Sequence, residues 1–185
     1  FVEEMIGYAR SKAQALSLSN VEFRCVDGEV IDAMKNAFDA VTMRWGLMFM
    51  PDPVACMRHV NTALKPGGKA VVCCWTEAAN NPFVTVPLGV LKRHMEIPEP
   101  PAGAPGIFAL ASPDRLRAIF AEAGFRDVAI EQVTIPMADF QTGAEYDVFI
   151  RELAGPVASL FAQLPADTQA IVKQEIAREA EARSA

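Results

Sequence analysis

Positively charged residues are scarce in this sequence, and they are not gathered into clusters. The 185 residues include 17 Lys and Arg against 23 Asp and Glu, which gives a formal net charge of -6. A protein that binds nucleic acid through its phosphates needs grouped Lys and Arg, commonly together with aromatic side chains. The sequence therefore predicts no nucleic-acid-binding surface.

Long apolar runs are also missing. No run reaches the ~20 residues that a helix needs to cross a bilayer. The first four residues, Phe-Val-Glu-Glu, lack the positive charge that precedes the apolar core of a signal peptide. We therefore expect a cytoplasmic protein that inserts no segment into a membrane.

Paired cysteine spacings are absent as well. The four cysteines are Cys25, Cys56, Cys73 and Cys74, and no two of them form a C-x-x-C pair. Cys73 and Cys74 are adjacent in a predicted strand, so their side chains point to opposite faces. We expect all four to be reduced packing residues, and we predict no metal site.

The composition is that of a globular protein, with 51% hydrophobic and 22% charged residues. A chain of this length suits one domain with a single core. The most regular pattern starts with an apolar segment, Phe38–Met43, that has the character of a strand. A loop follows, then one helical period from Pro53 to Leu64, and then a second strand from residue 69 to residue 75.

The turns of this β-loop-α-β unit can be predicted in detail. Asp52 suits the N-cap of the helix and Pro53 its first position, where the missing N-H has no partner to lose. Pro66 prevents the helix from continuing, and two glycines then allow a sharp return into the second strand. Strands joined in this way are parallel, and ligands of open parallel sheets lie beyond the carboxyl ends of the strands. The loop at residues 44–50 is therefore the expected ligand loop.

Further elements are predicted on both sides of this unit. A Pro- and Gly-rich stretch at residues 76–111, with at most a short helix near 86–95, is expected to form a lid. Strands are predicted at residues 21–26 and 125–135, and helices at 1–18, 30–35, 113–124, 143–153, 156–163 and 168–183, the last capped by Asp167.

Four segments of the chain resemble the class I S-adenosylmethionine-dependent methyltransferases. F-D-A-V at Phe38 and L-K-P-G-G-K-A-V-V at Leu64 are similar to the fourth and fifth strands of that family. V-E-F-R-C-V-D-G-E at Val21 is similar to its third strand and acidic turn, and E-E-M-I-G-Y-A-R at Glu3 to the helix after its second strand. The nearest group acts on small molecules and includes quinone-biosynthesis enzymes of methyltransferase type 11.

The resemblance implies an α/β, Rossmann-like methyltransferase sheet that is incomplete. The family's first two strands, which carry its glycine-rich turn, and its last strand have no counterpart, so we expect a fragment truncated at both ends, followed by C-terminal helices. The expected parts are residues 1–75 as a partial cofactor-binding core, residues 76–111 as the acceptor-covering insertion and residues 112–185 as the remainder of the domain. The alternative is a complete domain of different topology.

The resemblance also implies contacts to the cofactor, S-adenosylmethionine. Asp27 would accept a hydrogen bond from the adenine amine, while backbone amides near Gly28 and Glu29 would meet a ring nitrogen. Alternatively, Asp27 only caps the helix that follows. Further cofactor contacts are expected from the ligand loop and from the first helix, at Arg44, Trp45, Gly46 and Met5.

The acceptor is expected to be a small molecule lined by Phe49, Trp75, Phe83 and His94. Transfer from a sulfonium needs alignment and exclusion of water more than a nucleophile or metal, so no catalytic residue is assigned. His94 and Asp52 are the nearest bases, although His94 could equally lie on a solvated face and Phe49 in the core. A non-catalytic remnant, or a partner-binding structural fragment, is the second hypothesis. A third hypothesis is a nicotinamide-dependent Rossmann enzyme. Such an enzyme predicts a catalytic Tyr or Lys near the end of the second strand of this unit, and the sequence has neither there.

Overall fold

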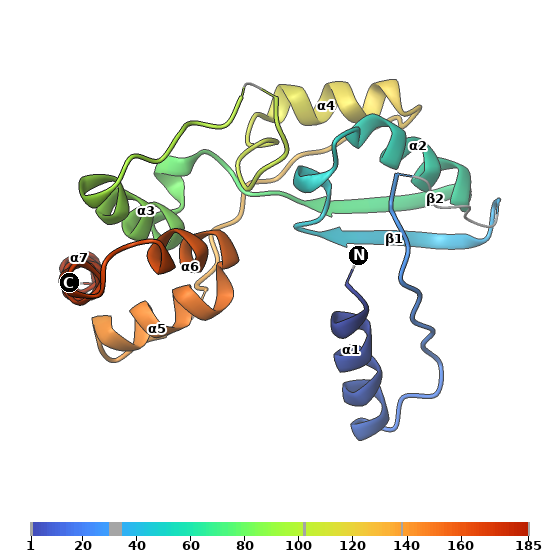
Figure 1. Ribbon diagram of the computed structural model, residues 1–185. Coiled ribbons are helices and arrows are strands. Elements are labelled where there is room, and N and C mark those ends of the chain that lie inside the picture. The colour runs from blue at the N-terminus through green and yellow to red at the C-terminus, as the bar shows by residue number, and fades with distance from the viewer. Residues whose placement is uncertain (1, 30–34, 102, 138, 185) are drawn as a thin grey trace. The chain divides into compact units, whose positions relative to one another are not determined.

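The structure is a computed structural model that describes residues 2–29, 35–101, 103–137 and 139–184 (Figure 1). The chain divides into two compact units. The first unit comprises residues up to 74 together with residues 113–128, and the second comprises residues 75–112 together with the remainder from residue 129. Each unit is described by itself.

The first unit contains the predicted β-loop-α-β arrangement. Strands β1 (Phe38–Arg44) and β2 (Leu64–Cys73) pair in parallel, and helix α2 (Pro53–Ala63) connects them. The ladder is regular from Ala40, opposite Lys69, to Arg44, opposite Cys73, and it is interrupted before Ala40. The interruption accommodates the Pro-Gly-Gly turn, whose Gly67 has a φ of 82° that only glycine adopts without strain.

Helix α2 begins and packs as its sequence predicts. The Asp52 side chain accepts a hydrogen bond of 2.9 Å from the Ala55 amide, and Pro53 occupies the first turn. The buried face of the helix consists of Cys56, Met57, Val60 and Ala63. Helix α4 (Pro113–Glu122) packs against α2, and the Asn61 side chain donates to the Ala123 carbonyl at 2.9 Å.

Two predicted strands are not formed. Residues 21–26 and 125–135 are irregular, and among the described residues no strand pairs with either segment. Both alternate like strands, but a strand exists only where a neighbour accepts its backbone hydrogen bonds. Most of the helix predicted at residues 30–35 lies outside the described residues. The first helix is present as α1 (Glu3–Ala15), and its Arg10 donates a long hydrogen bond of 3.4 Å to the Phe23 carbonyl.

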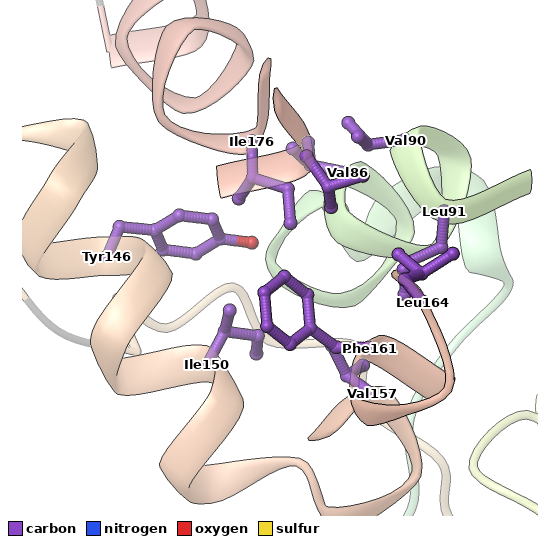
Figure 2. Close-up of a cluster of buried hydrophobic side chains, with 10 residues drawn as sticks. Val86, Val90, Leu91, Tyr146, Ile150, Val157, Phe161, Leu164 and Ile176 are labelled. Atoms are coloured by element: carbon purple, nitrogen blue, oxygen red, sulfur yellow. The ribbon is translucent and has the colours of Figure 1, made fainter. Parts of the chain in front are cut away.

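The second unit is helical. It contains α3 (Pro82–His94), α5 (Gly143–Leu153), α6 (Gly155–Ala162) and α7 (Ala166–Ser184), after a short turn at Ala78–Asn80. Helix α3 begins four residues earlier than predicted, because Pro82 is well suited to a first helical turn. Asp167 lies inside the first turn of α7 rather than before it. The core side chains come from all four helices and from the turn between α6 and α7 (Figure 2): Val86, Val90, Leu91, Tyr146, Ile150, Val157, Phe161, Leu164, Val172 and Ile176.

A proline inside α3 explains one polar contact in this core. Pro87 is buried within the helix and has no N-H, so the Phe83 carbonyl loses the donor that would ordinarily reach it four residues later. The Tyr146 hydroxyl donates to this carbonyl at 2.6 Å. Tyr146 is only 8% exposed, and its burial raises the pKa of the phenol. The hydroxyl therefore satisfies a carbonyl that the proline leaves open.

No helix of the described chain is both long and apolar enough to cross a membrane.

We predict that Tyr146→Phe lowers the free energy of unfolding by about 1–3 kcal/mol, because it leaves a buried carbonyl without a donor. Restoring the N-H with Pro87→Ala should reduce that cost by about 1 kcal/mol in a double-mutant cycle. Urea unfolding followed by circular dichroism measures both values. Tyr8→Phe is the matched control, because Tyr8 is 74% exposed, and it should be neutral. Additive effects of Tyr146→Phe and Pro87→Ala would contradict the explanation.

Candidate functional site

The candidate site lies in the first unit and begins with an acidic turn, which we define as Asp27–Glu29. All three residues are partly buried. The Asp27 carboxylate accepts a hydrogen bond of 2.9 Å from the Glu29 amide, which closes the turn through a side chain. Asp27 therefore uses one carboxylate oxygen locally, and the other has no hydrogen bond within the described chain.

The acidic turn is attached to the N-terminus of α2. The Glu29 carboxylate accepts a hydrogen bond of 2.6 Å from the Asp52 amide. The Asp52 carboxylate in turn accepts from the Ala55 amide, so two carboxylates occupy the start of this helix. Helix N-termini favour negative charge, because their amides have no partners inside the helix and the helix dipole points its positive end there.

The middle of the acidic turn rests on two sulfur-containing side chains. A Cβ added at Gly28 would lie 3.3 Å from the Met50 methyl carbon and 3.5 Å from the Cys56 sulfur. Cys56 itself is 1% exposed. Burial raises the pKa of its thiol to about 11, and the negative charges of Glu29 and Asp27 act in the same direction. The thiol is therefore a neutral packing group beneath the turn.

The ligand loop begins at the end of β1 and ends at Met50. Trp45 has a φ of 58°, a left-handed conformation that is costly for a bulky residue and is more frequent at functional sites. Its amide donates to the Cys73 carbonyl at 3.0 Å, and the Arg44 guanidinium lies 4.8 Å from the centre of its ring. The Trp45 backbone is thus fixed at the carboxyl end of the sheet, where it continues the ladder to β2.

The remainder of the loop alternates between packing and exposure. Gly46 has little space, since an added Cβ would lie 3.1 Å from the Met43 side chain. A single turn at Leu47–Phe49 then buries Leu47 and Met48 completely, while Phe49 stays 53% exposed.

The structure therefore brings together two of the regions predicted to contact the cofactor. The acidic turn contacts Met50, the last residue of the ligand loop, and Asp52, two positions later. Met5, the remaining predicted cofactor contact, lies on α1 and is 70% exposed. The interaction that sequence analysis missed is the one between Glu29 and Asp52. Twenty-three positions separate these residues, and no local pattern could reveal the pairing.

Three of the predicted acceptor contacts lie in the second unit. The rings of Trp75 and Phe83 are 4.7 Å apart, centre to centre. His94 is at the opposite end of α3, where its Nε2 lies 3.2 Å from a Glu175 carboxylate oxygen on α7. Hydrogen bonds from His94 and from Arg93 lower the pKa of that carboxyl group. Trp75 and Phe83 thus form a pair, whereas His94 contacts Glu175, which also pairs with Arg93, between α3 and α7.

Comparison with known proteins identifies the family of the N-terminal part. Residues 1–72 match a methyltransferase domain family. The demethylmenaquinone methyltransferases of Shouchella clausii and Staphylococcus carnosus are each 31% identical to the chain, over 150 and 160 residues. These alignments cover 72% and 77% of this chain and 61% and 62% of the relatives. The chain thus spans less than two thirds of the length of these curated relatives. The resemblance predicted from the sequence is confirmed.

We predict that Cys56 reacts far more slowly with iodoacetamide than Cys25 does. At pH 8, a thiol with a pKa of about 11 contains about a hundredfold less thiolate than one at the ordinary value of 9.0, and Cys56 is buried in addition. Cys25 is exposed and serves as the internal control. Mass spectrometry of timed native labelling measures both rates. Equal labelling of Cys25 and Cys56 in folded protein would contradict the described packing under Gly28.

Proposed function

Since residues 1–72 belong to a methyltransferase domain family, we propose that this chain is part of a cytoplasmic enzyme that transfers a methyl group from S-adenosylmethionine to a small molecule. The similarity to demethylmenaquinone methyltransferases favours a quinone-like aromatic acceptor. The observation that carries the proposal is the attachment of the acidic turn to the helix that follows the ligand loop.

The residues at this place fit the nucleoside part of the cofactor. The Asp27 carboxylate has one oxygen left to accept a hydrogen bond from an exocyclic amine. Trp45 presents a flat ring at the carboxyl end of β1, where ligands of open parallel sheets are usually found. In our proposal Asp27 orients the adenine, and the Trp45 and Gly46 carbonyls accept hydrogen bonds from the ligand, because the Trp45 amide already donates to Cys73.

When bound, S-adenosylmethionine supplies a methyl group on a sulfonium that is already an activated leaving group. The contribution expected of the protein is to align this group with the acceptor and to exclude water. In the first unit, the exposed Phe49 stays a proposed acceptor contact. Trp75 and Phe83, whose rings form a pair within the second unit, stay a proposal that rests on the sequence. His94 stays an acceptor contact by the sequence proposal alone, since in the second unit its Nε2 interacts with Glu175.

The sheet supports the proposal that this chain is a fragment of a larger fold. Parallel sheets normally have more than two strands and are covered on both faces. Here α2 covers one face, and residues of the other, among them Val71 at 57%, are exposed. Phe38, at the start of β1, is 43% exposed. We propose that further strands of the parent protein, including the one with the glycine-rich turn, extend this sheet.

The same exposed surface favours the second candidate function. A sheet with one exposed face that includes Phe38 and Val71 is also what a partner-binding fragment without catalysis would present. The two candidates differ in whether the chain binds the nucleoside.

We predict that this chain binds S-adenosylhomocysteine and that Asp27→Ala weakens binding by about 10- to 100-fold, as expected for loss of a hydrogen bond to a charged group. Isothermal titration calorimetry measures both affinities, with circular dichroism as the test of folding. Glu22→Ala is the matched control, because Glu22 lies in the same segment and, within the described residues, forms just an exposed ion pair with Arg24. Absence of heat from a folded sample would favour the non-catalytic candidate.

A further inference from the structure

The Glu29 side chain does not face a ligand position, because it is already engaged by the protein. Its carboxylate accepts from the Asp52 amide at 2.6 Å, which is short for a hydrogen bond between an amide and a carboxylate. The Glu29 amide donates to Asp27. Both polar groups that could have contacted a nucleoside are therefore used to build the turn and to attach it.

The described part of the segment that carries the acidic turn has few other anchors. Upstream, the Phe23 carbonyl accepts a hydrogen bond of 3.4 Å from Arg10. Downstream, the Asn36 and Ala37 amides donate to carbonyls at the end of α2. Among the described residues between these points, the Glu29 carboxylate is the only group with a hydrogen bond to another part of the chain. The position of the turn therefore depends on this contact and on the packing of Gly28.

The packing of Gly28 and the hydrogen bond of Glu29 act on the same three residues. Gly28 lies against the Met50 and Cys56 side chains, which fixes how closely the turn approaches α2. The Glu29 carboxylate fixes the position of the turn along the axis of α2, because it accepts from the amide of the N-cap residue Asp52. With both constraints present, the free oxygen of Asp27 has one defined position relative to the ligand loop.

We infer that Glu29 is a positioning residue: through the Asp52 amide it holds the acidic turn on α2, and so sets where Asp27 reads the exocyclic amine of the nucleoside. This inference rests on the proposed function. It replaces the expectation that the Glu29 amide itself meets a ring nitrogen, because Asp27 occupies that amide.

Two variants of Glu29 distinguish loss of its hydrogen bond to the Asp52 amide from a general loss of structure. Glu29→Ala removes the acceptor, whereas Glu29→Gln keeps an amide oxygen at the same reach and should rescue. The first readout is hydrogen exchange at the Asp52 amide, which needs no ligand. We expect about a tenfold faster exchange in Glu29→Ala, and rates within about threefold of the unmutated chain in Glu29→Gln and in the control Glu22→Ala.

The second readout is the preference of the chain for S-adenosylhomocysteine over its purine analogue, which lacks the 6-amino group. Calorimetry should give a preference of about tenfold or more for the unmutated chain and for Glu29→Gln. Glu29→Ala should lose as much of this preference as Asp27→Ala does. In Asp27→Ala the carboxylate is absent, and in Glu29→Ala the Asp27 carboxylate is no longer held where it meets the amine.

The two readouts distinguish failure of the positioning role from failure of the proposed function. Unchanged exchange at Asp52 in Glu29→Ala, or faster exchange with the preference retained, overturns the positioning role while the proposed function stands. If the folded, unmutated chain shows no preference for the 6-amino compound, the reading of the nucleoside by Asp27 fails. The positioning role then fails with it, and faster exchange in Glu29→Ala would show only a structural attachment.

Discussion

The attachment of an irregular segment to the start of a helix is the interaction on which the candidate site depends. A parallel sheet places its loops at one edge, but it does not by itself bring a turn 23 residues away in sequence to that edge. The Asp52 amide does so by donating a hydrogen bond to the Glu29 carboxylate. The Asp52 carboxylate also caps α2 by accepting from the Ala55 amide. Asp52 therefore stabilises the start of its own helix and, through its amide, the neighbouring turn.

The second unit illustrates the same physical rule in an apolar setting. There a proline removes a backbone donor, and a buried tyrosine hydroxyl from another helix replaces it. In both units a backbone group at a helix start or before a helix proline is paired with a side chain that is distant in sequence. These two contacts are polar anchors within surroundings that are otherwise held by apolar packing.

The sequence was sufficient for elements whose determinants are local. The cap at Asp52, the helix start at Pro53 and the glycine-containing return into the second strand follow from residue types within a few positions. The structure has all three, with Gly67 at positive φ in the return. Strands at residues 21–26 and 125–135 were predicted from alternation alone, and they are irregular because no described neighbour pairs with them. Contacts between distant positions, such as Glu29 with Asp52, leave no local pattern.

The central claim is that the acidic turn and the ligand loop face one nucleoside. Its most direct test is the titration of isotope-labelled chain with S-adenosylhomocysteine, followed by nuclear magnetic resonance of the Gly28 amide and the Trp45 indole. The account predicts that both signals shift with the same dissociation constant, while amides of α5 do not move. Shifts confined to the second unit, or a shift of only one of the two signals, would contradict it.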